Sequence, residues 1–77
     1  MEIKNDISII ITQDPIEGCL VYIEQIPQIS ACGSSVAEAN AKLMAELRLY
    51  ERNNFSTYNI VEYKYTASLY NWVQLYL

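Results

Sequence analysis

Few side chains in this 77-residue chain could carry out chemistry. Histidine, the usual general base near neutral pH and the commonest metal ligand, is absent. The only thiols are Cys19 and Cys32, whereas a structural zinc site normally takes four ligands, mostly Cys and His. We therefore expect no metal site and no cofactor, and we expect both cysteines to be reduced and buried as small apolar side chains.

Two pairs of carboxylates are close enough in the sequence to act together. Asp14 and Glu17 share a predicted turn, and Glu46 and Glu51 share a predicted helix. Two-metal nucleases hold their ions between carboxylates, but neither pair here is accompanied by a phosphate-binding loop, so we interpret both as solvated surface. Cys32 precedes a predicted helix N-terminus, where a thiolate is favoured, but it has no histidine partner. We expect that the chain is not an enzyme.

The aromatic residues indicate binding instead. The chain has seven Tyr and one Trp, residue types that bury a large area at low entropic cost and are enriched at interface hot spots. Tyrosines can equally fill a small core and cover sheet edges. The apolar segment 70–77 is expected to pack on its own domain or to dock onto another chain, because an unattached terminus frays. For Trp72 and its neighbours we favour an interface.

Charge and composition narrow the possible partners. The net charge is −4, and the five Lys and Arg residues are scattered singly, so no direct DNA binding is expected. An acidic surface suits a basic protein partner.

No apolar run approaches the roughly 20 residues that span a bilayer, and the charged start lacks a signal peptide. We expect one cytoplasmic domain over residues 1–77, forming a homodimer or higher oligomer because so short a chain has a thin core.

The elements that would position these groups follow from apolar periodicity. Alternation predicts strands over 3–12 and 19–26, joined by a turn at 14–18, and a short third strand over 29–32. Pro27 is expected to end the second strand.

A helix is predicted from Val36 to about Arg52. Ser35 and Glu38 fit a capping box, in which the serine oxygen accepts from the Glu38 amide and the glutamate reaches back to the Ser35 amide. Asn53-Asn54 is expected to end the helix in the left-handed conformation. The apolar stripe of this helix contains Val36, Ala39, Leu43, Leu47 and Tyr50.

The segment 57–69 is rich in strand-forming residues. Strict alternation places Val61, Tyr63 and Tyr65 on one face and Ile60 and Glu62 on the other. The predicted fold is α+β, in the order β-β-β-α-β, with a small mainly antiparallel sheet and one helix packed on one face.

The stretch from Gly18 to Ala39 resembles the HicB-like antitoxin family. The resemblance is carried by a strand that ends in Ile26-Pro27, a short strand over 29–32, Gly33, a polar pair with Ser35 second, and Glu38-Ala39 at the start of a helix. It implies a partial RNase H-like fold without nuclease activity. It also implies the antitoxin role of a bacterial type II toxin–antitoxin system, in which the domain binds and neutralises a small basic ribonuclease toxin.

The chain departs from the family pattern at three places. Gln28 occupies the position of a common glycine, and Ser34 that of a common acidic residue. Many members carry a C-terminal DNA-binding domain, and we expect none in this chain.

The first functional hypothesis is therefore an antitoxin-like domain, dimeric, that binds a small basic protein. The glutamates would contact cations and the aromatics would serve as apolar anchors; the candidate residues are Glu17, Tyr22, Glu24, Glu62, Tyr65 and Trp72. The second hypothesis is a stand-alone structural or oligomerisation module without a cognate toxin. Its support is the apolar segment 70–77 and the second, alanine-rich side of the helix.

Overall fold

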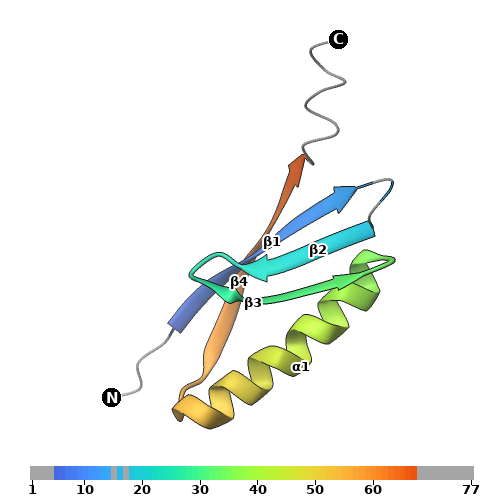
Figure 1. Cartoon of the computed structure of the whole chain (residues 1–77). Coiled ribbons are helices and arrows are strands. Elements are labelled where there is room, and N and C mark those ends of the chain that lie inside the picture. The colour runs from blue at the N-terminus through green and yellow to red at the C-terminus, as the bar shows by residue number, and fades with distance from the viewer. Residues whose placement is uncertain (1–4, 15, 17, 68–77) are drawn as a thin grey trace.

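A computed structural model describes residues 5–14, 16 and 18–67 of the chain. The elements follow in the order β1 (Asn5–Asp14), β2 (Gly18–Ile23), β3 (Ile26–Gly33), α1 (Val36–Asn54) and β4 (Tyr58–Ala67). The strands form one sheet in the order β3-β2-β1-β4, and α1 packs against one face of it (Figure 1). β1 pairs antiparallel with β2, β2 pairs antiparallel with β3, and β4 runs parallel to β1. The predicted small α+β fold and its order of elements are confirmed.

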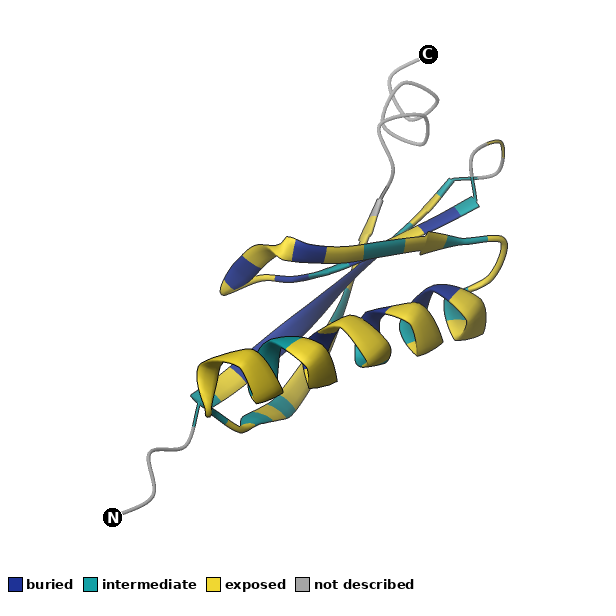
Figure 2. Ribbon diagram, turned by 60° about the horizontal axis from the view of Figure 1, so that its bottom comes forward, coloured by how far each residue is buried: buried dark blue, intermediate teal, exposed yellow. Residues whose placement is uncertain are grey.

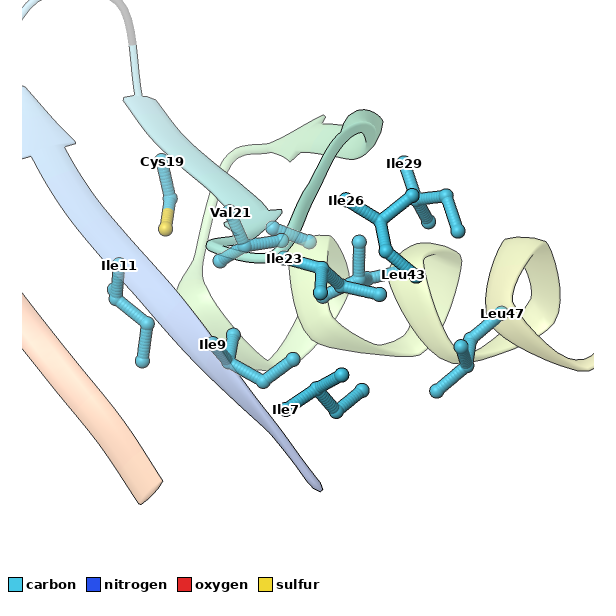
Figure 3. Close-up of a cluster of buried hydrophobic side chains, with 11 residues drawn as sticks. Ile7, Ile9, Ile11, Cys19, Val21, Ile23, Ile26, Ile29, Leu43 and Leu47 are labelled. Atoms are coloured by element: carbon cyan, nitrogen blue, oxygen red, sulfur yellow. The ribbon is translucent and has the colours of Figure 1, made fainter. Parts of the chain in front are cut away.

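The core lies between α1 and the sheet. Alternate residues of β1, Ile7, Ile9 and Ile11, point to the helix, and Leu43 of α1 is fully buried opposite them (Figure 3). The predicted helix stripe is confirmed: Ala39, Leu43 and Leu47 are buried, and Val36 and Tyr50 pack against them. The remaining buried members of the cluster are Cys19, Val21, Ile23, Ile26 and Ile29.

The N-terminus of α1 is capped almost as predicted. The Ser35 hydroxyl accepts a hydrogen bond from the Glu38 amide at 3.1 Å. The Glu38 carboxylate accepts from the Ser34 amide at 3.0 Å and from the Ser34 hydroxyl at 2.5 Å, whereas the sequence predicted the Ser35 amide as its donor. The difference arises because Ser34 offers two donors to one carboxylate. These bonds, together with Lys42 at 3.4 Å, lower the pKa of Glu38.

The C-terminus of α1 differs from the prediction. The helix continues through Asn54, and Phe55 adopts the left-handed conformation with φ of 50°, where an asparagine was expected. The Phe55 amide still donates to the Glu51 carbonyl, so the cap satisfies the helix end despite the unfavourable residue type. The Phe55 side chain is 98% exposed.

The predicted boundary between the second and third strands was also wrong. β2 ends at Ile23, the chain turns at Glu24 and Gln25, and β3 begins at Ile26. The Gln25 side chain accepts from the Ser8 amide at 2.9 Å, which ties this turn to β1. Pro27 is accommodated inside β3 because β3 is an edge strand, where a missing N–H costs no ladder bond.

A bulge in β4 overturns the face assignment predicted for that strand. Ile60 pairs with Ile7, but the next residue of β1, Ser8, pairs with Glu62, so Val61 is an extra residue. The alternation of β4 side chains between the two faces of the sheet therefore shifts by one residue after Val61. Ile60, before the bulge, and Tyr63, after it, lie on the same, helix-facing side of the sheet.

The two cysteines lie on opposite faces of the sheet. Cys19 is buried in the core, as predicted, but Cys32 is exposed, which corrects the expectation that both are buried. The register explains this, because Cys32 lies opposite Leu20, whose side chain points away from the helix.

The outer side of α1 is also largely exposed (Figure 2). In the described part of the chain, no helix is long and apolar enough to cross a membrane.

Candidate functional site

The sheet face opposite α1 carries apolar, aromatic and charged side chains of the described residues. Because side chains alternate along a strand, β2 sends Cys19, Val21 and Ile23 to the core and Leu20 and Tyr22 to this other face. We call this surface the open face. Its accessible residues, assigned by strand register and contacts, are Thr12, Leu20, Tyr22, Glu24, Pro27, Ser30, Cys32, Glu62, Lys64 and Thr66. Ser8 and Ile10 of β1 point to the same side but are buried.

A shallow, open depression lies at one end of the open face, over β2 and β3. It is lined by Leu20, Tyr22, Glu24, Pro27 and Ser30. Leu20 is 40% exposed and Tyr22 is half-buried, so their apolar surfaces are available to a ligand. The lining combines an aromatic ring, an aliphatic side chain and a carboxylate at the rim. That composition suits binding of a protein surface, because apolar centres with polar rims are typical of such interfaces.

An ion pair crosses the open face beside the depression. Lys64 of β4 lies 3.1 Å from the Glu24 carboxylate, on the far side of β1. The hydrogen bond and charge of Glu24 raise the pKa of Lys64, and Glu62 adds to the effect. The three groups leave one negative charge in excess, so the field at this edge of the depression is weakly acidic. Glu24 is thus already paired, although 44% of its side chain remains accessible.

Two of the carboxylates considered for catalysis, Asp14 and Glu51, make structural contacts. The Asp14 side chain accepts from the Ile16 amide at 2.8 Å in the turn after β1. Glu51 accepts from the Tyr58 amide at 2.8 Å, which joins the end of α1 to the start of β4. Over residues 5–14, 16 and 18–67, no three Cys, Asp or Glu side chains gather closely enough to hold a metal ion.

The structure divides the residues predicted to bind a partner. Tyr22 and Glu24 lie together in the depression, and Glu62 lies on the same face on β4. Tyr65 is 69% exposed but points to the helix-facing side, so it cannot share a flat contact with them. Glu17 and Trp72 fall outside the described residues.

Sequence reasoning missed three residues that line the depression, Leu20, Pro27 and Ser30, and Lys64 beside it. Leu20 could have been selected, because it alternates with the buried Cys19 on a strand that was predicted. Pro27 and Ser30 were hidden by the misplaced boundary between β2 and β3. Lys64 and Glu24 are 40 residues apart in sequence. Their contact depends on the strand order that places β4 beside β1 and β1 beside β2, which no local pattern reveals.

Comparison with known proteins gives no independent identification. No protein-family model, no curated protein and no solved structure matches this chain. The resemblance of residues 18–39 to the HicB-like family therefore rests on the motif residues alone.

Proposed function

We propose that this chain is a non-catalytic protein-binding domain of the antitoxin type, which uses the open face to bind and neutralise a small basic protein, a ribonuclease toxin. The observation that carries the proposal is the depression on β2 and β3. There Leu20 and Tyr22 offer apolar surface directly beside the carboxylate of Glu24.

The physical chemistry of this depression favours a protein partner. A half-buried tyrosine with a restricted side chain loses little entropy on binding, so it is a suitable anchor. The depression is open to solvent, whereas small molecules usually bind in clefts or cavities that bury most of their surface. A flat or convex protein surface would cover it better.

Charge favours a basic partner. The chain carries a net charge of −4, and Glu24 and Glu62 both lie on the open face. An arginine of the partner placed over Tyr22 could share the Glu24 carboxylate with Lys64. Binding should then weaken as salt rises, because exposed charges are screened.

The experiment is co-expression of the tagged chain with the protein encoded by the adjoining reading frame. We expect the two proteins to purify together and the chain to relieve any growth arrest that the neighbour causes. Tyr22→Ala and Glu24→Lys should each reduce both effects, while Leu49→Ala, on the exposed side of α1, should leave them unchanged. Failure of the wild-type chain to bind that protein, or to relieve the arrest, would overturn the proposal.

A second function, self-association without a cognate toxin, is favoured by a different observation. β4 is an edge strand and carries exposed Val61, Tyr63 and Tyr65. Tyr63 and Tyr65 lie on the helix-facing side of the sheet, opposite the depression, whereas Lys64 of the same strand pairs with Glu24 in the lining of the depression.

A further inference from the structure

Among the described residues, no strand pairs with the outer edge of β4. β4 is ten residues long and lies at the end of the sheet, so within the described residues it pairs only with β1. α1 packs over β2 and β3 and does not cover this edge (Figure 1). Val61, Tyr63 and Tyr65 are 56%, 49% and 69% exposed here. A long open edge with apolar side chains is a template for another strand.

We propose that this edge binds the β4 strand of a second copy of the chain, antiparallel, about a two-fold axis that passes through Tyr63. Such pairing joins two four-stranded sheets into one continuous sheet with both helices on the same face. This pairing gives the expected self-association a specific surface. The proposal does not depend on the proposed toxin binding.

The charges on β4 are complementary to themselves in this arrangement. Residues opposite each other in an antiparallel pair point to the same face of the sheet. With Tyr63 at the axis, Glu62 of each copy lies opposite Lys64 of the other. Because the axis repeats every contact, two opposite-charge pairs form on the open face. The Glu24 carboxylate, 3.1 Å from Lys64 within each copy, extends each pair into a three-group network.

Charge also favours this register over the registers in which the axis passes through a neighbouring residue. If the axis passed through Lys64, the two ammonium groups would lie directly opposite each other, which is destabilising. If it passed through Tyr65, Lys64 would face Thr66, and no cross-strand ion pair would form within the described part of β4. Only the axis at Tyr63 pairs both charges of the strand.

The apolar residues fit the same register. The two Tyr63 rings meet at the axis on the helix-facing side. On either side of them, Tyr65 of one copy faces the bulge formed by Ile60 and Val61 of the other. Aromatic side chains opposite β-branched ones are among the favourable cross-strand pairs. A bulge and a lysine can also protect a sheet edge from pairing. The mass of the wild-type chain in solution distinguishes protection of the edge from pairing.

The test uses charge exchange between two variants of the full chain. Glu62→Lys leaves two positive charges on β4, and Lys64→Glu leaves two negative charges. By sedimentation equilibrium we expect the wild-type chain to reach twice its 8.9 kDa mass. Each variant alone should dissociate about tenfold more readily, because two attractive pairs become repulsive. An equimolar mixture of the two variants should recover the wild-type association, because all opposing pairs are again of opposite sign.

Glu46→Lys on the outer side of α1 is the matched control, since it makes the same charge change as Glu62→Lys away from β4. Circular dichroism of each variant verifies that it is folded. If the wild-type chain remains monomeric at millimolar concentration, the proposal is contradicted. The bulge and Lys64 would then serve to protect the edge from pairing. A dimer that responds equally to Glu46→Lys and Glu62→Lys, or a variant mixture that does not reassociate, would also contradict it.

Discussion

Lys64 on β4 donates to both carboxylate oxygens of Glu24, at 3.3 and 3.1 Å, although Glu24 lies in the turn after β2, and β1 separates β2 from β4. This ion pair connects the two halves of the open face. It joins the depression on β2 and β3 to the strand that forms the sheet edge. The two side chains are 41% and 44% exposed, so solvent screens their attraction.

A double-mutant cycle of Glu24→Gln and Lys64→Gln should show a small favourable coupling in the free energy of unfolding at low salt and none at molar salt. Because Glu24 raises the pKa of Lys64 in the folded state, the coupling should be complete below pH 10.5 and be lost as pH rises through the higher folded value. Urea unfolding across salt and alkaline pH measures it. A coupling that survives molar salt would show that packing, not charge, links the two side chains.

The capping contacts of α1 predict a second pH dependence, at the acid end. Hydrogen bonds from Ser34 and the charge of Lys42 lower the pKa of Glu38 in the folded state. Their stabilisation is therefore complete above the unfolded value of 4.5 and is lost as pH falls below it. Glu38→Gln should flatten this part of the acid unfolding profile, and Ser34→Ala should give an intermediate profile. An unchanged profile in Glu38→Gln would contradict the assignment.

Phe55 should be a site where a substitution stabilises the protein. A non-glycine residue in the left-handed conformation costs about 1 kcal/mol, and a side chain that is 98% exposed contributes little packing in return. Phe55→Gly should therefore raise the free energy of unfolding by about 1 kcal/mol. Phe55→Ala keeps a Cβ and should not give this gain. Destabilisation by Phe55→Gly would mean that the ring makes contacts that its exposure does not reveal.

Two leucines of α1 should differ sharply in their contributions to stability. Leu43 is fully buried against the sheet, so Leu43→Ala should cost about 2–5 kcal/mol, enough to unfold much of so small a domain. Leu49 is 53% exposed on the other side of the helix, and Leu49→Ala should change stability by no more than about 0.5 kcal/mol. Thermal unfolding monitored by circular dichroism compares the two. Equal effects would contradict the packing of α1 on the sheet.

Local patterns predicted the parts of the fold that local chemistry controls. The helix stripe of Ala39, Leu43 and Leu47, the cap at Ser35 and the alternation of β1 were all visible, because each depends on residues a few positions apart. The prediction failed where a tertiary context overrides a local preference. Pro27 lies within a strand because that strand is at the sheet edge. Phe55 adopts, at the end of α1, the left-handed conformation that glycine usually adopts.

The open face was only partly predictable for the same reason. Alternation alone could place Leu20 and Tyr22 together on β2. It could not foresee the bulge at Val61, which moves Tyr65 to the other face from Tyr22, nor the strand order that brings Lys64 to Glu24. Strand order and bulges depend on long-range pairing, which a single sequence does not encode in its local periodicity.

The central claim is that the open face binds a basic protein partner. Its most direct test is amide chemical-shift mapping of the isotope-labelled chain during titration with the protein encoded by the adjoining reading frame. We predict saturable shifts centred on Leu20, Tyr22, Glu24 and Ser30, with little change along the exposed side of α1. Shifts confined to α1, or no shifts at saturating partner, would contradict the claim.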